Sequence, residues 1–110
     1  MNKFIIGCDS NQNWIKPGRV LTSMLKRVDV AVFDTIKAKA EGKFEAGQFD
    51  LGLKEGAVDF ALDSYNRSLL TPAVEAKANE IKKQIIDGKI KVPDFYDTLR
   101  SGAKKERLNR

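Results

Sequence analysis

A short apolar run, residues 4–8, leads directly into a polar cluster, residues 9–13, and this junction constrains the fold of the chain most. An unbroken apolar run of this length is typical of a central parallel strand covered on both faces, so we expect a buried strand over residues 3–8. The polar cluster is rich in loop formers, and the loop ends at Pro17-Gly18. This pattern predicts a βα unit, in which ligands bind at the carboxyl end of the strand, where Asp9 lies.

The following stretches carry helical and extended patterns in turn. Between residues 20 and 41, apolar side chains such as Val20, Met24 and Val28 recur at three- and four-residue spacing, which predicts one helix that Gly42 ends. Residues 48–54 alternate between apolar and polar or small side chains, which predicts a second strand. Residues 58–62 are apolar again, and their pattern fits either a short strand or the start of a turn.

A second helix is predicted up to Asp87, because Thr71 suits an N-cap, Pro72 suits the first helical position and Gly88 suits the end. Residues 89–93 then form a brief extended segment. The resulting order is β-α-β-β-α-β, in which residues 58–62 are the element that could be a strand or a turn. This order predicts an α/β fold. So few elements leave sheet edges and strand faces without cover, which indicates a piece of a larger α/β protein or a chain with a partner.

The net charge of +5 raises the question of nucleic-acid binding. Residues 104–110 alone contribute +3 of it, from four basic residues and one acidic residue, and elsewhere basic and acidic residues are interleaved. No alternation of aromatic and basic residues suggests a base-stacking surface, so we expect no nucleic-acid partner. The lack of histidine excludes His-based metal sites and Ser–His or Cys–His catalysis, and the single Cys8 excludes an internal disulfide.

The first residues also invite comparison with a secretion signal. Ile5-Ile6-Gly7-Cys8 resembles the residues that precede a lipoprotein cysteine. The apolar stretch before it is much shorter than the ~7–15 residues of a secretory signal, however. We therefore expect a strand here and no signal peptide or lipoprotein box of the chain's own.

Several segments together resemble one known family. In chain order they are residues 8–14 (CDSNQNW), 17–18 (PG), 21–29 (LTSMLKRVD), 52–56 (GLKEG), 61–66 (ALDSYN) and 85–93 (IIDGKIKVP). Over about residues 4–93 the chain is similar to the basic membrane protein (Bmp) family, the purine-nucleoside-binding lipoproteins of ABC importers. Each motif alone is weak, and the combination in this order is quite specific.

The resemblance implies a partial Rossmann-like lobe of a type I periplasmic-binding-protein fold, in which two lobes enclose the ligand. Because the chain matches about the family's last third, the N-terminal lobe and the lipoprotein signal are expected upstream. Residues 1–93 would form the C-terminal part of the substrate-binding protein, and residues 94–110 a basic tail that we expect to be frayed. The implied location is the extracytoplasmic face of the cell membrane, the implied partner is an ABC permease, and no cofactor is implied.

The candidate ligand contacts are Asp9 and Lys26. The carboxylate of Asp9 offers two acceptor oxygens to the two hydroxyls of a ribose diol, and hydrogen bonds to a charged group contribute about 1.5–3 kcal/mol each. Lys26 lies about one and a half helical turns after Val20 on the predicted helix, within reach of the strand ends. It would keep Asp9 ionised, or donate to a purine acceptor or a ribose hydroxyl. The resemblance implies that the aspartate and lysine at these positions contact the nucleoside.

Trp14 is a third candidate, because its ring offers a flat apolar surface on which a base stacks. Packing of Trp14 beneath its own helix is an equal alternative. Two positions depart from the family pattern, since Asn11 stands where the family has a second aspartate and Gly56-Ala57 where it has paired glycines. Neither departure touches the proposed ligand contacts.

The sequence favours binding over catalysis. An enzyme with Asp9 and Lys26 as an acid/base pair is the first alternative, but the chain offers no nucleophile, metal cluster or phosphate loop to support it. The second alternative is a small interaction or regulatory domain derived from the same lobe, with the basic tail as its contact surface. Because lobe closure requires contacts from both lobes, we expect the chain by itself to bind nucleosides weakly or not at all.

Overall fold

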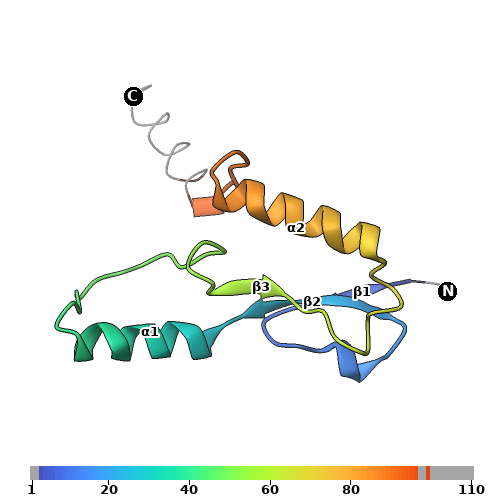
Figure 1. Cartoon of the computed structure of the whole chain (residues 1–110), viewed down its shortest axis with the longest axis horizontal. Coiled ribbons are helices and arrows are strands. Elements are labelled where there is room, and N and C mark those ends of the chain that lie inside the picture. The colour runs from blue at the N-terminus through green and yellow to red at the C-terminus, as the bar shows by residue number, and fades with distance from the viewer. Residues whose placement is uncertain (1–2, 97–98, 100–110) are drawn as a thin grey trace.

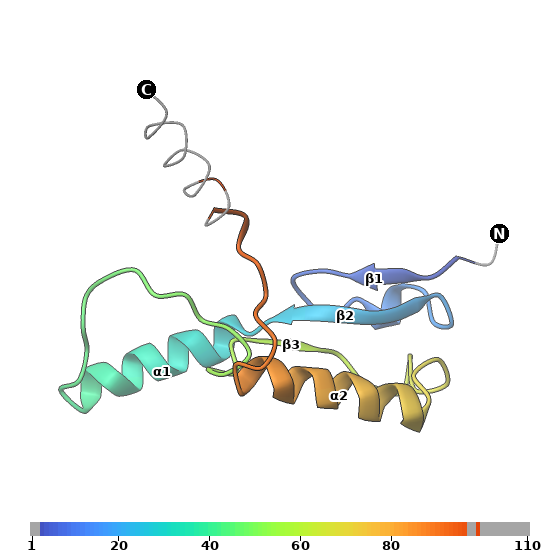
Figure 2. The same ribbon diagram turned by 90° about the horizontal axis from the view of Figure 1, so that it is seen from above.

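The computed structural model describes residues 3–96 and residue 99 of the 110-residue chain. Its elements are β1 (Ile5–Gly7), the 3-10 helix η1 (Asn13–Ile15), β2 (Val20–Lys26), α1 (Val28–Ala40), β3 (Val58–Phe60) and α2 (Pro72–Ile86). In Figure 1, α2 runs alongside the sheet, whereas α1 continues from the end of β2 and projects beyond the strands, as the view from above in Figure 2 also shows. None of the helices described is long and apolar enough to cross a membrane.

The central strand of the three-stranded sheet is β2, in the order β1-β2-β3. β1 runs parallel to β2, with Gly7 beside Ser23, and β3 runs antiparallel to β2, with Phe60 beside Met24. Parallel neighbours need a crossover of about a dozen residues or more, and residues 8–19 provide it with only the single turn of η1. The parallel pairing places the carboxyl ends of β1 and β2 at the same edge of the sheet.

The strand predicted at residues 3–8 is present as β1, but the prediction that it is a buried central strand is wrong for the described chain. β1 lies at the edge of the sheet, and Ile5 and Ile6 expose 58% and 64% of their surface. Only Gly7 is buried in this strand. An apolar run shows that a strand is suited to burial, whereas burial itself requires covering elements, and the described residues supply none over Ile5 and Ile6.

The prediction of one helix over residues 20–41 is wrong in its first part, since these residues form β2 and the helix α1 begins only at Val28. Apolar side chains at positions 20 and 24 fit one face of a helix and one face of a strand equally well. Pairing with β1 on one side and β3 on the other decides for the strand. The predicted helix end is confirmed, because Gly42 has a φ of +70° directly after α1.

Residues 48–54 and 89–93 form no strand in the described structure, so two of the predicted extended segments are wrong. Alternation of side chains makes a strand only where a neighbouring strand accepts its hydrogen bonds. Residues 58–62, whose pattern fitted either a strand or a turn, contain the strand β3. The predicted second helix is confirmed as α2, with the Thr71 hydroxyl accepting the N–H of Val74 at 3.4 Å and Pro72 at the first position.

The core of the described chain is small. Its buried apolar residues are Val20, Ala57, Ala61 and Leu70, and neither α1 nor α2 contains a buried residue. The radius of gyration of 18.3 Å exceeds the roughly 13 Å of a compact domain of this length. The open shape is consistent with the expectation of a piece of a larger α/β protein.

Gly7 allows the closest approach between β1 and its neighbours. A Cβ at this position would lie 2.6 Å from Ser23 Oγ and 2.9 Å from Gln12 Oε1. We expect Gly7→Ala to lower the free energy of unfolding by about 1–3 kcal/mol, as overpacking typically does, in urea denaturation followed by circular dichroism. The control is Gly47→Ala, where a Cβ would meet only the Phe49 ring at 3.7 Å. Equal effects of the two changes would contradict the steric explanation.

Candidate functional site

Asp9 follows β1 by two residues and has an unusual backbone conformation. Its φ of +78° lies in the left-handed region, which aspartate adopts more readily than most residues other than glycine. Its carbonyl oxygen accepts the N–H of Lys26, the last residue of β2, at 2.9 Å. The backbone of Asp9 therefore joins the carboxyl ends of the two parallel strands.

The side chains of Asp9 and Lys26 also lie together, with Lys26 Nζ at 3.5 Å from Asp9 Oδ1. Lys26 is on a strand and not on the predicted helix, so its proximity comes from the parallel pairing of β1 and β2. The two side chains are 63% and 70% exposed. An ion pair this exposed contributes little to stability. Because both side chains are largely exposed, both charged groups are accessible to a ligand.

Trp14 lies in η1, and its indole N–H donates to the carbonyl oxygen of Asn11 at 3.1 Å. Trp14 is 61% exposed as a residue, so it is not buried beneath a helix. No hydrogen bond or ring contact between described residues joins Trp14 to Asp9 or Lys26. The structure thus brings two of the three predicted site residues together and attaches the third to its own loop.

A polar network beneath the loop of Asp9 was not predicted from the sequence. Ser23 Oγ, on β2, donates to Asn13 Oδ1 at 2.8 Å and accepts the N–H of Gln12 at 3.0 Å. The Asn13 amide donates to Asp63 Oδ2 at 3.1 Å. Asn13 and Ser23 are completely buried, and every buried side-chain polar atom among the described residues has a hydrogen-bond partner.

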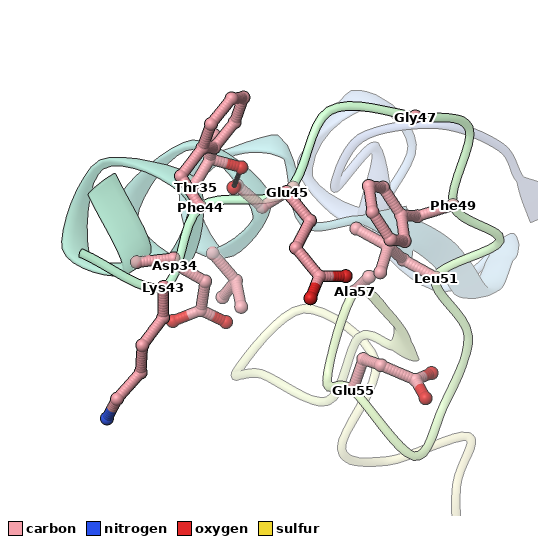
Figure 3. A pocket seen from close by; sticks show the side chains of 13 residues that line it. Asp34, Thr35, Lys43, Phe44, Glu45, Gly47, Phe49, Leu51, Glu55 and Ala57 are labelled. Carbon is pink, nitrogen blue, oxygen red and sulfur yellow. Dashed lines mark hydrogen bonds between the residues drawn. The ribbon is translucent and has the colours of Figure 1, made fainter. Parts of the chain in front are cut away.

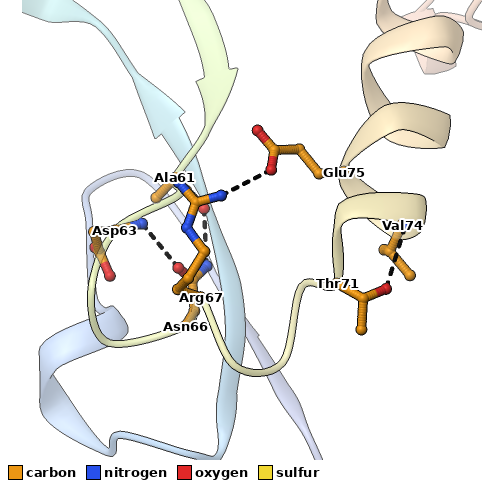
Figure 4. Close-up of polar contacts among 7 residues, drawn as sticks. All are labelled: Ala61, Asp63, Asn66, Arg67, Thr71, Val74 and Glu75. Carbon is orange, nitrogen blue, oxygen red and sulfur yellow. Dashed lines mark hydrogen bonds and ion pairs between the residues drawn. The ribbon is translucent and has the colours of Figure 1, made fainter.

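The network continues through the turn after β3, shown in Figure 4. The Asn66 amide donates to the carbonyl oxygens of Leu21 and Ala61, both at 2.9 Å, and its Oδ1 accepts the N–H of Asp63 at 2.9 Å. Asn66 is completely buried. The one sequence signal for this turn is the spacing of Asp63 and Asn66, whose side chains bond backbone groups two and three residues away.

Asp63 is the acidic member of this network. Partial desolvation raises the pKa of its carboxyl, but hydrogen bonds from the Asn11 side chain, the Tyr65 N–H, the Asn13 side chain and the Asn66 N–H together outweigh it. The pKa of Asp63 therefore lies below its ordinary value, and the group is ionised at neutral pH. The shortest hydrogen bonds to this carboxylate come from Asn11 Nδ2 and from the Tyr65 N–H, both at 2.8 Å.

A pocket lies elsewhere, between α1 and the segment 43–57, as Figure 3 shows. It has a volume of about 460 Å³, with the rings of Phe44 and Phe49 among its lining. None of the three predicted site residues lines it. A second pocket, of about 390 Å³, reaches Lys26 along β2. No group of acidic or cysteine side chains in the described ranges is arranged to bind a metal ion.

Comparison with known proteins gives one consistent result. Residues 1–95 match a family model described as ABC transporter substrate-binding protein PnrA-like. Basic membrane protein D of Borreliella burgdorferi is 33% identical over 98 residues, which are 87% of this chain and 28% of that protein. An uncharacterized lipoprotein of Pyrococcus abyssi is 44% identical over 55 residues, which are 50% of this chain and 14% of that protein.

A solved structure is also similar. The crystal structure of an ABC transporter solute-binding protein from Aeropyrum pernix has a TM-score of 0.62 and 28% sequence identity, and the match covers 96% of this chain and 37% of that one. This likeness confirms the predicted α/β class and the partial lobe of a periplasmic-binding-protein fold. The chain spans well under half the length of the relatives that it matches.

Proposed function

Because the chain belongs to the PnrA-like family of ABC transporter substrate-binding proteins, we propose that it contributes Asp9 and Lys26 to a cleft that binds a purine nucleoside. The observation that carries this proposal is the exposed pair itself, with Lys26 Nζ 3.5 Å from Asp9 Oδ1 at the carboxyl ends of adjacent parallel strands. Ligands of open α/β sheets bind outside these strand ends.

The chemistry of the pair suits a ribose. The Asp9 carboxylate accepts hydrogen bonds from the 2′- and 3′-hydroxyls, and the Lys26 ammonium donates to a ribose oxygen or to a purine acceptor. Trp14 is proposed as a secondary contact for a base, since the residue is largely exposed while its indole N–H is bonded to Asn11.

The role proposed for the whole protein is capture of the nucleoside outside the membrane for delivery to an ABC permease, without turnover. Several similar proteins are named lipoproteins, which supports an extracytoplasmic, membrane-anchored location. We propose residues 1–93 as the substrate-binding part. Residues 97–98 and 100–110 of the proposed basic tail lie outside the described residues.

Titration of the ¹⁵N-labelled chain with inosine, followed by NMR, tests the proposal. We expect binding in about the millimolar range, because two or three charge-assisted hydrogen bonds of ~1.5 kcal/mol each give about 3–4.5 kcal/mol, close to the ~4 kcal/mol of a 1 mM complex. The shifts should centre on the amides of Asp9 and Lys26. The affinity for 2′-deoxyinosine, which lacks one hydroxyl of the diol, should be about tenfold lower than that for inosine.

Two variants and one control locate the site. Asp9→Asn and Lys26→Met should each abolish the inosine-dependent shifts, whereas Asp29→Asn should leave them unchanged, because Asp29 is an exposed carboxylate bonded to Arg27. An unaltered response of Asp9→Asn would exclude this site. Micromolar or tighter binding by the wild-type chain would show that it contains a whole cleft and not part of one.

A further inference from the structure

The left-handed conformation of Asp9 needs support from its surroundings. A non-glycine residue with a φ of +78° stores strain of order 1–3 kcal/mol and persists only where neighbouring contacts fix it. The Asp9 side chain is too exposed to supply this support, and on one side the bond from Lys26 N–H to the Asp9 carbonyl does so. The other side of the loop must be held by the residues that follow Asp9.

Those residues are held by Ser23 on β2, through Gln12 and Asn13, and by one carboxylate, that of Asp63. Asp63 Oδ2 accepts from Asn11 Nδ2 at 2.8 Å and from Asn13 Nδ2 at 3.1 Å. Asn11 Oδ1 in turn accepts the N–H of Asn13 at 3.0 Å, so the two side chains and the backbone between them form one unit. Asp63 therefore binds the loop two to four residues beyond Asp9, from a segment about 50 residues away in sequence.

Asp63 is itself rigidly placed. Its N–H donates to Asn66 Oδ1, and the Asn66 amide is bonded to the Leu21 carbonyl on β2, as Figure 4 shows in part. The loop is thus fixed to the same strand that carries Lys26. Hydrogen bonds to an ionised acceptor are roughly twice as strong as neutral ones, and the pKa of Asp63 lies below its ordinary value.

We infer that Asp63 is a positioning residue, which holds the loop of Asp9 in the conformation that presents the Asp9 carboxylate beside Lys26. The effect of Asp63 on nucleoside binding rests on the proposed function. The effect of Asp63 on the loop conformation rests on its hydrogen bonds with Asn11 and Asn13. Asp63 does not contact the ligand. Its charge acts through the loop.

The test compares Asp63→Asn with Asp59→Asn in NMR hydrogen exchange. Asp59 is the matched control, a partly buried aspartate bonded to Lys82 of α2 at 2.7 Å. Asp63→Asn should speed exchange of the Lys26 N–H about tenfold more than that of Ala61 N–H, which bonds Ser23 across β2 and β3. It should also weaken the strong cross-peak between the Asp9 Hα and N–H that a positive φ produces. Asp59→Asn should change both exchange rates by the same factor.

The effect on binding is measured by the inosine titration. Asp63→Asn should lower the affinity for inosine about tenfold, whereas Asp59→Asn should leave it unchanged. Equal acceleration of both amides in Asp63→Asn, with the Asp9 cross-peak intact, would overturn the positioning role. If Asp63→Asn does not fold, Asn11→Ala removes one of the two bonds to Asp63 from an exposed position, together with the bond from Asn13 N–H to Asn11 Oδ1, and should act in the same direction. A wild-type chain without any inosine response would contradict the proposed function, whereas the exchange comparison decides the conformational role of Asp63 independently.

Discussion

Replacement of Asn66 by alanine is expected to lower the free energy of unfolding by about 3 kcal/mol or more, since each buried polar group left without a partner costs ~1–3 kcal/mol. Asn66 is 0% exposed, and its side chain bonds the carbonyl of Leu21, the N–H of Asp63 and the carbonyl of Ala61, the last of which also accepts the Thr22 hydroxyl. Alanine removes all three bonds at once. Urea denaturation followed by circular dichroism measures the loss.

The control for this variant is Gln84→Ala, which removes an exposed side-chain hydrogen bond to Glu80 within α2. A surface change of this kind should alter stability by less than about 0.5 kcal/mol. If Asn66→Ala lowered the free energy of unfolding by as little as this control does, the turn after β3 would be held to β2 by something other than the buried amide. The same experiment would then weaken the structural basis for the role of Asp63.

Acidification is expected to destabilise the chain progressively from about pH 5 downward, because the carboxylates that hold its segments together become protonated. Desolvation raises the pKa of Asp59, but its hydrogen bonds with Lys82 and with the Phe60 N–H and the nearby charges of Lys82 and Arg27 outweigh this, so the pKa is lowered. The pKa of Asp63 is lowered as well. The ordinary aspartate value of 3.8 applies to the unfolded chain.

The lowered pKa values of Asp59 and Asp63 determine the direction in which stability changes with pH. A carboxyl whose pKa is lower in the folded state contributes stability above its unfolded pKa, and that contribution disappears as the pH falls through the folded pKa. The urea midpoint should therefore fall steadily between about pH 5 and the acid limit. Asp59→Asn and Asp63→Asn should each start from a lower midpoint at pH 7 and fall less steeply. A pH dependence as steep in both variants as in the wild type would assign the acid sensitivity to other groups.

Local signals were sufficient for several parts of this protein. The N-cap, proline and terminal glycine of α2 lie within its own segment, and so do the apolar run of β1 and the glycine after α1. The pair of Asp9 and Lys26 was also predicted, although Lys26 was assigned to a helix. Their proximity in the structure follows from the parallel pairing of β1 and β2, which the helix predicted for residues 20–41 would not have provided.

The remaining features depend on contacts between distant segments. Residues 20–26 carry a pattern that suits helix and strand alike, and only β1 and β3 as neighbours make them β2. The bonds from Asp63 to Asn11 and Asn13 span about 50 residues, so no local pattern predicts them. The sequence by itself determined that Asp9 follows a strand and which family the chain resembles. Only the tertiary structure decided how the loop of Asp9 is held, because hydrogen bonds between distant segments form only once the chain has folded.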